Sequence, residues 1–187
     1  WINLKNFSPG NKVQKFTALF VGRLISKKGI KVILQCAPKI PAINFIIVGN
    51  GPLENYVSNF SKKYKNIQYL GAIPNDKLPD IYRRASIFCI ASQYPEGFGR
   101  VSMEAVASGL PVIGSNLGSI PEALDSTVSI LFKPTVSNFT KTLKMLSIQP
   151  KNYKTLQLNC RSYAEENFSD SNFKIILKAY SQLLNTN

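Results

Sequence analysis

Residues 15–49, KFTALFVGRLISKKGIKVILQCAPKIPAINFIIVG, contain two short apolar runs separated by a segment of helical length. The runs KFTALFVG and INFIIVG are rich in β-branched and aromatic residues, which is typical of buried strands. Between them, Ile30, Ile33 and Leu34 recur at helical spacing, which predicts an amphipathic helix. A strand, a helix and a second strand in this order predict a parallel pair of strands joined by a crossover helix.

The same alternation continues along the chain. Further strands are predicted at 66–71, 85–92, 110–115 and 128–132, and further helices at 52–64, 75–85 and 99–109. We therefore expect an α/β fold, a doubly wound Rossmann-like parallel sheet of about six strands with helices on both faces. From about residue 136 the sequence changes to three helical segments, which we expect to cover the sheet and close the domain.

The size and composition of the chain are those of a single soluble domain. It has 187 residues, of which 44% are hydrophobic and 18% charged, and no apolar run approaches the length of a membrane span. Lysine and arginine number 23 against 10 acidic residues, a net charge of +13. Because the basic residues are scattered, this excess is explained either by a solvated lysine-rich surface or by a polyanionic ligand, such as nucleotide phosphates or anionic lipid headgroups.

Cysteine and histidine usage bears on location and on metal chemistry. The three cysteines, Cys36, Cys89 and Cys160, lie in apolar runs without CxxC spacing, so we expect no disulfide framework and a reducing, cytoplasmic setting. The chain has no histidine, no Asp-x-Asp pair and no cysteine pair at zinc spacing. The sequence therefore predicts metal-independent chemistry.

Glycines follow the predicted strands closely, at Gly22, Gly49, Gly71 and Gly114. In open parallel sheets ligands bind beyond the carboxyl ends of the strands, where glycine permits a close approach of the backbone. The loop VGRLISKKG places Arg23 and Lys28 between the first strand and its helix, an arrangement suited to phosphate. The alternative for this loop is an exposed basic turn without a ligand.

The stretch YPEGFGRVSMEA, residues 94–105, places Glu96 and Glu104 on either side of a glycine-rich turn. The amides of EGFG precede a helix predicted to begin near Arg100 or Val101, which makes an anion-binding nest. Two carboxylates bracketing a phosphate site suit a ligand with hydroxyl-bearing rings on both sides of a diphosphate, namely a nucleotide sugar. The alternatives are charge compensation at the helix N-terminus for Glu104 and a solvated loop acid for Glu96.

The segment PEGFGRVSMEAVASGLPVIGSNLGSIPE resembles the Glu-x7-Glu signature of the retaining glycosyltransferases of the GT-B fold, in the large group 1 family. VGRLISKKG, FIIVGNGP, NIQYLGAIP and LPDIYRRASIFCIAS follow in that family's order and spacing, from about residue 2 to 180. The resemblance implies the donor-binding C-terminal half of such an enzyme, with a hinge at 1–12 and the donor domain at 13–187. The N-terminal acceptor domain is not in this chain, so the isolated domain is expected to be inactive.

The resemblance also implies roles for individual residues. Arg23 and Lys28 would bind the donor diphosphate and stabilise the leaving group, Glu96 would orient the transferred sugar, and Glu104 would hold the ribose hydroxyls. The remaining substrate-binding residues would be Gly22, Asn50, Ile73, Gly97, Phe98, Gly99, Arg100 and Val101, with Asn50 and Ile73 at the base. The donor would be a UDP-, GDP- or ADP-sugar used without a cofactor, and its anomeric configuration would be retained.

Other functions are compatible with parts of this pattern. A GT-B relative that does not transfer sugar, such as a sugar-nucleotide epimerase or a phosphorylase, would need other catalytic groups. A basic nucleic-acid-binding module is suggested only by the net charge, and the aromatic residues fall mostly in predicted core positions, so we expect no nucleic-acid partner. Many family members act on lipid-linked acceptors at the inner membrane surface, where a basic face would hold such an enzyme. Ser119 stands where the family usually shows a second glycine.

Overall fold

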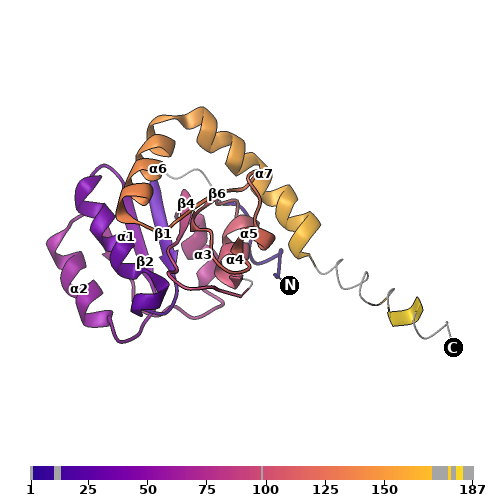
Figure 1. Cartoon of the computed structure of the whole chain (residues 1–187), viewed down its shortest axis with the longest axis horizontal. Coiled ribbons are helices and arrows are strands. Elements are labelled where there is room, and N and C mark those ends of the chain that lie inside the picture. The colour runs from indigo at the N-terminus through magenta and orange to yellow at the C-terminus, as the bar shows by residue number, and fades with distance from the viewer. Residues whose placement is uncertain (1, 11–13, 98, 170–176, 178–179, 183–187) are drawn as a thin grey trace.

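The computed structural model describes residues 2–10, 14–97, 99–169, 177 and 180–182. Its centre is a six-stranded, all-parallel sheet in the order β3-β2-β1-β4-β5-β6 (Figure 1). The strands are β1 (Thr17–Val21), β2 (Asn44–Val48), β3 (Ile67–Tyr69), β4 (Ile87–Ile90), β5 (Val112–Ser115) and β6 (Ser129–Phe132). The predicted doubly wound, Rossmann-like fold is confirmed.

Helices cover both faces of the sheet. On one face lie α1 (Ile30–Cys36), α2 (Glu54–Lys63) and α6 (Val136–Ile148). On the other lie α3 (Leu78–Arg83), α4 (Arg100–Ala107), α5 (Ile120–Ala123) and most of α7 (Pro150–Phe168). Two short 3-10 helices, η1 (Ser26–Lys28) and η2 (Ala37–Lys39), flank α1.

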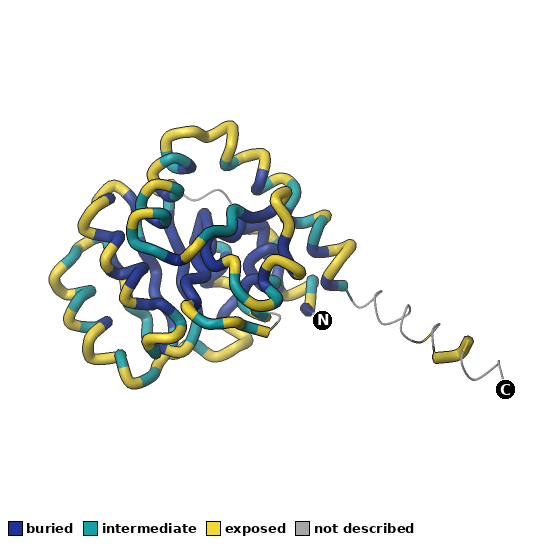
Figure 2. Tube along the Cα trace, in the orientation of Figure 1, coloured by how far each residue is buried: buried dark blue, intermediate teal, exposed yellow. Residues whose placement is uncertain are grey.

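The two faces are built from alternate residues of each strand. In β1, Leu19 and Val21 belong to the core under α3, α4 and α7, whereas Ala18 and Phe20 belong to the core under α1 and α6. All four are buried, as are the corresponding residues of the neighbouring strands (Figure 2). This burial on both faces explains why the strands read as continuous apolar runs.

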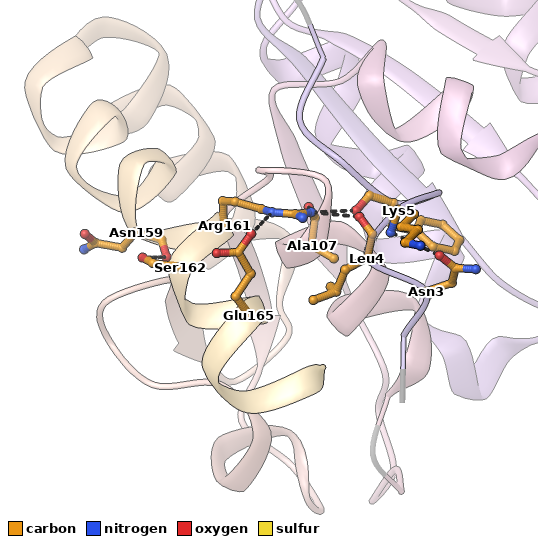
Figure 3. A network of polar contacts seen from close by, with 9 residues as sticks. Asn3, Leu4, Lys5, Ala107, Asn159, Arg161, Ser162 and Glu165 are labelled. Atoms are coloured by element: carbon orange, nitrogen blue, oxygen red, sulfur yellow. Dashed lines mark hydrogen bonds and ion pairs between the residues drawn. The ribbon is translucent and has the colours of Figure 1, made fainter. Parts of the chain in front are cut away.

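The segment at 2–10, expected to belong to a linker, packs against the domain. Ile2 and Phe7 are buried, and the amide of Ile2 donates to the carbonyl of Phe168, 3.2 Å away. Arg161 of α7 fixes the segment by donating from Nη1 to the carbonyls of Leu4, at 3.1 Å, and Phe7, at 3.0 Å (Figure 3).

The same Nη1 also reaches the carbonyl of Ala107 at the end of α4, 3.3 Å away, while Nε of Arg161 pairs with Glu165. One guanidinium thus joins α4, α7 and the first residues of the chain. Of the three expected C-terminal helical segments, two are α6 and α7, and the third, around Ile176, lies largely outside the described residues. Within the described ranges no helix has both the length and the apolar character needed to cross a membrane.

Candidate functional site

The loops expected to form a site meet at the carboxyl edge of the sheet, where the strand order reverses between β1 and β4. In doubly wound sheets this switch point opens a crevice that binds ligands. A cavity of about 200 Å³ lies there. Its polar lining comes from the loop after β1 and the loop after β4, namely Gly22, Arg23, Lys28, Ser92 and Glu96.

Lys28 and Glu96 are held together across this crevice. Nζ of Lys28 lies 2.6 Å from Oε1 of Glu96, and their side chains are 24% and 9% exposed. Lys28 ends η1, whose position is fixed because the amide of Gln93 donates to the carbonyl of Lys27, 2.8 Å away. The Lys28 ammonium has three donors, so it can keep Glu96 and still donate to an anionic ligand.

The backbone around Glu96 is braced from a third loop. Residues Glu96 and Gly118 form a parallel bridge, and the amide of Ser119 donates to the carbonyl of Glu96, 3.0 Å away. A Cβ at Gly118 would come within 2.4 Å of the Glu96 amide nitrogen, so the close approach of these loops depends on glycine. The hydroxyl of Ser92 also donates to Oε1 of Glu96. Glu96 is therefore held in place rather than solvated freely.

Arg23 provides an uncommitted cation at the mouth of the cavity. Its side chain is exposed, and within the part of the chain that the structure describes it makes no hydrogen bond or ion pair. A free guanidinium beside a partly buried lysine is suited to two neighbouring phosphate groups, because it can donate to two oxygens at once. Carboxylate and ammonium are already paired to each other, so the net charge facing a ligand comes from Arg23.

Glu104 lies in the second turn of α4 in a buried hydrogen-bonded network. Its Oε2 accepts from the hydroxyl of Tyr82, 3.0 Å away, and its Oε1 lies 3.1 Å from Nε of Arg100. Tyr82 is itself buried, and its hydroxyl oxygen also lies 3.1 Å from the carbonyl oxygen of Val101, so the two acceptors share its single O–H proton. Burial raises the pKa of Glu104 above its usual value of 4.5, although the hydrogen bonds from Tyr82 and Arg100 oppose the shift.

This raised pKa predicts a stability change that depends on pH. Protonated Glu104 is favoured in the folded state, so its stabilising contribution is complete below about pH 4.5 and is lost as pH rises through the higher folded pKa. Glu104→Gln cannot ionise and keeps an acceptor for Tyr82. We expect the midpoint of thermal unfolding of this variant to gain on the wild type as pH rises from about 4 to about 7. A constant difference across this range would contradict the assignment.

Similarity to known proteins identifies the family of this chain. A family model described as glycosyl transferases group 1 matches residues 2–166. The chain belongs to this family. It is 31% identical over 149 residues to the phosphatidylinositol N-acetylglucosaminyltransferase gpi3 subunit of Schizosaccharomyces pombe, a match that covers 74% of the chain and 32% of the relative. The chain thus spans about a third of the length of the curated relatives that it matches.

Solved structures show the same fold. Anabaena Alr3699/HepE in complex with UDP superposes with a TM-score of 0.83 at 18% identity, covering 100% of this chain and 56% of that one. The C-terminal domain of the group 1 family protein LpcC from Francisella tularensis superposes with a TM-score of 0.78 at 22% identity, covering 91% of this chain and 100% of that one. That second structure is of a C-terminal domain alone.

In this group 1 glycosyl transferase domain, five predicted site residues line the cavity: Gly22, Arg23, Lys28, Glu96 and Val101. Five others do not line it: Asn50, Gly97, Gly99, Arg100 and Glu104. Arg100 instead lines a separate cavity of about 540 Å³, together with Met103 and Glu122. Asn50 is connected to the first loop because its carbonyl accepts from the amide of Leu24, 2.7 Å away. Ile73 is partly buried against the core beneath α3 and α4, and Phe98 lies outside the described residues.

Sequence reasoning missed the groups that hold the two glutamates. Ser92 and Gly118 brace Glu96, and Tyr82 holds Glu104. The ring centroid of Tyr94 lies 5.7 Å from Nζ of Lys28, close enough for a cation–π contact. Ser92 and Tyr94 share a loop with Glu96, and Gly118 follows a strand. Their positions in the sequence could therefore have marked them as candidate site residues. No sequence pattern marks the hydroxyl of Tyr82 as a polar partner. Within the described ranges no three metal-ligating side chains cluster.

Proposed function

We propose that this chain is the donor-binding domain of a glycosyltransferase, which moves a sugar from a nucleoside-diphosphate sugar to an acceptor. The observation that carries the proposal is the cavity at the topological switch point, where Arg23, Lys28 and Glu96 converge from two loops. Two cations and one carboxylate in a crevice of this size match a diphosphate joined to a hydroxyl-bearing ring. The Anabaena structure named for its UDP complex supports this ligand class.

In the proposed complex Lys28 and Arg23 bind the diphosphate. Lys28 retains its contact with Glu96 and turns a second N–H toward a phosphate oxygen, while Arg23 closes over the outer phosphate. The backbone amides at Gly97 and Gly99, which precede α4, would add further donors at the positive end of that helix. Glu96 accepts hydrogen bonds from the hydroxyls of the sugar, which places the anomeric carbon.

The proposed reaction is a substitution at that anomeric carbon with retention of configuration. The bond from the carbon to the diphosphate oxygen breaks, the acceptor oxygen forms a new bond on the same face, and the acceptor proton passes to the departing phosphate. Arg23 and Lys28 stabilise the negative charge that develops on the leaving diphosphate, a role that a metal ion has in other transferases. Glu96 is a positioning residue in this scheme and forms no covalent bond.

The nucleoside would lie on the other side of the phosphates. Glu104 is held by Tyr82 and Arg100, and Arg100 is largely exposed, so it can move away and free one carboxylate oxygen for the ribose hydroxyls. The loops at Asn50 and Ile73 would border the base. UDP, GDP and ADP all fit this description, because the proposed base contacts are partly to the backbone.

The rest of the enzyme is proposed from the family alone. Residues 1–12 would lead in from an N-terminal domain that carries the acceptor site, and 13–187 would form the donor domain. Without the partner domain half of the cleft is missing, so this chain should bind donor and transfer little or nothing. A cytoplasmic location is supported by the three free cysteines, which are all buried.

Calorimetric titration of the chain with UDP, GDP and ADP, each with and without EDTA, tests the proposal. We expect one of the three to bind with a dissociation constant at or below the millimolar range, unchanged by EDTA. Binding that requires added magnesium would refute metal independence but retain the donor-domain proposal. A folded chain that binds none of the three at millimolar concentration would overturn the proposal itself.

A further inference from the structure

A row of lysines and exposed aliphatic side chains runs along the outer side of α6 and α7. Lys141, Lys144 and Ile148 of α6 are exposed and have the spacing i, i+3, i+7. Three exposed residues of α7 have the same spacing. The second set is Lys151, Lys154 and Leu158, with only Gln149 between the two helices. Ile148 and Leu158 are each 66% exposed, unusually so for large aliphatic side chains.

The spacing places each set on one face of its helix. At 3.6 residues per turn, positions i, i+3 and i+7 fall within about 60° of one another. The buried residues of α6, Phe139, Leu143 and Leu146, fall on the opposite side of the helix, against the sheet. The row therefore points away from the domain, and Figure 2 shows exposed residues, in yellow, where α6 passes into α7.

The charge around the row has one sign. From Ser126 to Ala164 the chain has six basic residues and no acidic residue. Arg161 is committed to the carbonyls of the N-terminal segment, whereas all four lysines of the row are exposed. An amphipathic surface that combines lysines with isolated aliphatic side chains matches the interface of an anionic bilayer, where lysines meet headgroups and aliphatic groups enter the acyl boundary.

The middle of the row, where α6 passes into α7, lies at the edge of the sheet opposite the candidate donor site. The hydroxyl of Tyr153 in α7 donates to the carbonyl of Ser86, just before β4, and its ring packs on Phe16, just before β1. The start of α7 is thus at the amino edge of the strands, at the top of Figure 1. A surface bound at this corner would leave the carboxyl edge of the sheet open.

We propose that this row, Lys141, Lys144, Ile148, Lys151, Lys154 and Leu158, binds the surface of an anionic lipid bilayer. Nucleic acid is the poorer match, because single strands are held by aromatic stacking and the exposed hydrophobic residues here are aliphatic. Each lysine near an anionic surface contributes roughly a fivefold factor in affinity.

Co-sedimentation of the 187-residue chain with vesicles tests the row. We expect binding to phosphatidylcholine vesicles containing about 30% phosphatidylserine, weak binding to phosphatidylcholine alone, and loss of binding at high salt. Replacing the four lysines of the row by alanine should lower the partition coefficient by at least about 20-fold. The double variant Ile148→Ser, Leu158→Ser should also lower the partition coefficient, although its net charge is that of the wild type. Circular dichroism checks that both variants are folded.

A charge-matched variant supplies the control. Lys5, Lys62, Lys65 and Lys77 are exposed and lie outside the row, so replacing them by alanine removes the same charge. This variant should keep most of the vesicle binding. The proposal is overturned if the control loses as much as the row variant, if wild type shows no preference for anionic vesicles, or if the row variant loses oligonucleotide binding only.

Discussion

Lys28→Ala should weaken binding of a nucleoside diphosphate to this domain by about 10- to 100-fold, the effect expected for losing one hydrogen bond to a charged group in a partly buried site. Lys28 ends η1 at the crevice and lies 2.6 Å from Glu96, with its side chain 24% exposed. The substitution removes the partly buried cation of the cavity and leaves the Glu96 carboxylate facing the phosphates. Repulsion between these anions adds to the loss, and calorimetric titration of the folded variant measures it.

Lys27→Ala is the matched control for this change. Lys27 is the preceding residue of η1, carries the same charge and is exposed, and it makes no ion pair with a described acid. The backbone carbonyl of Lys27 accepts the hydrogen bond from the amide of Gln93, and the substitution retains this bond. We expect the affinity of Lys27→Ala to stay within about threefold of the wild type. Equal losses in the two variants would mean that general positive charge, and not a specific site, attracts the nucleotide.

Much of the fold could be predicted because its information is local. Continuous apolar runs such as residues 45–48 predict strands buried on both faces, and the helical spacing in residues 30–36 predicts a crossover helix. The N-terminal segment was harder to read. The resemblance implied a hinge at 1–12, yet Phe7 is buried and packs edge-on against Tyr82, with 5.7 Å between the ring centroids. One or two apolar residues give no periodicity from which such packing could be predicted.

The candidate site was predictable only in part, for the same physical reason. Residues that follow strands in a parallel sheet must share one edge, so the grouping of Arg23, Lys28 and Glu96 followed from strand order. Their pairing did not follow, because Lys28 and Glu96 are 68 residues apart and meet only when η1 docks beside the loop after β4. Likewise the contact of Tyr82 with Glu104 depends on how α3 packs against α4.

Gly29→Ala should destabilise the domain by about 2–5 kcal/mol, the sum of a left-handed backbone for alanine and overpacking. Gly29 joins η1 to α1 with φ +71°, and a Cβ there would lie 1.8 Å from the carbonyl oxygen of Ala91, the residue after β4. This oxygen belongs to the backbone, so no rotamer change can relieve the clash. The start of α1 must separate from β4, which also displaces Lys28.

Gly71→Ala separates the two causes. Gly71 has nearly the same conformation, with φ +69°, but a Cβ there would meet no atom within 4 Å. This control therefore carries the cost of the left-handed backbone alone, about 1–2 kcal/mol. In thermal or urea unfolding Gly29→Ala should lose clearly more stability than Gly71→Ala, and the excess measures the close approach of η1 and β4. Because that approach brings Lys28 to Glu96, Gly29→Ala should also lose nucleotide affinity while Gly71→Ala retains more of it. Equal destabilisation of the two variants would mean that the loop can move away from Ala91 at little cost, and that the crevice is less rigid than the packing around Gly29 indicates.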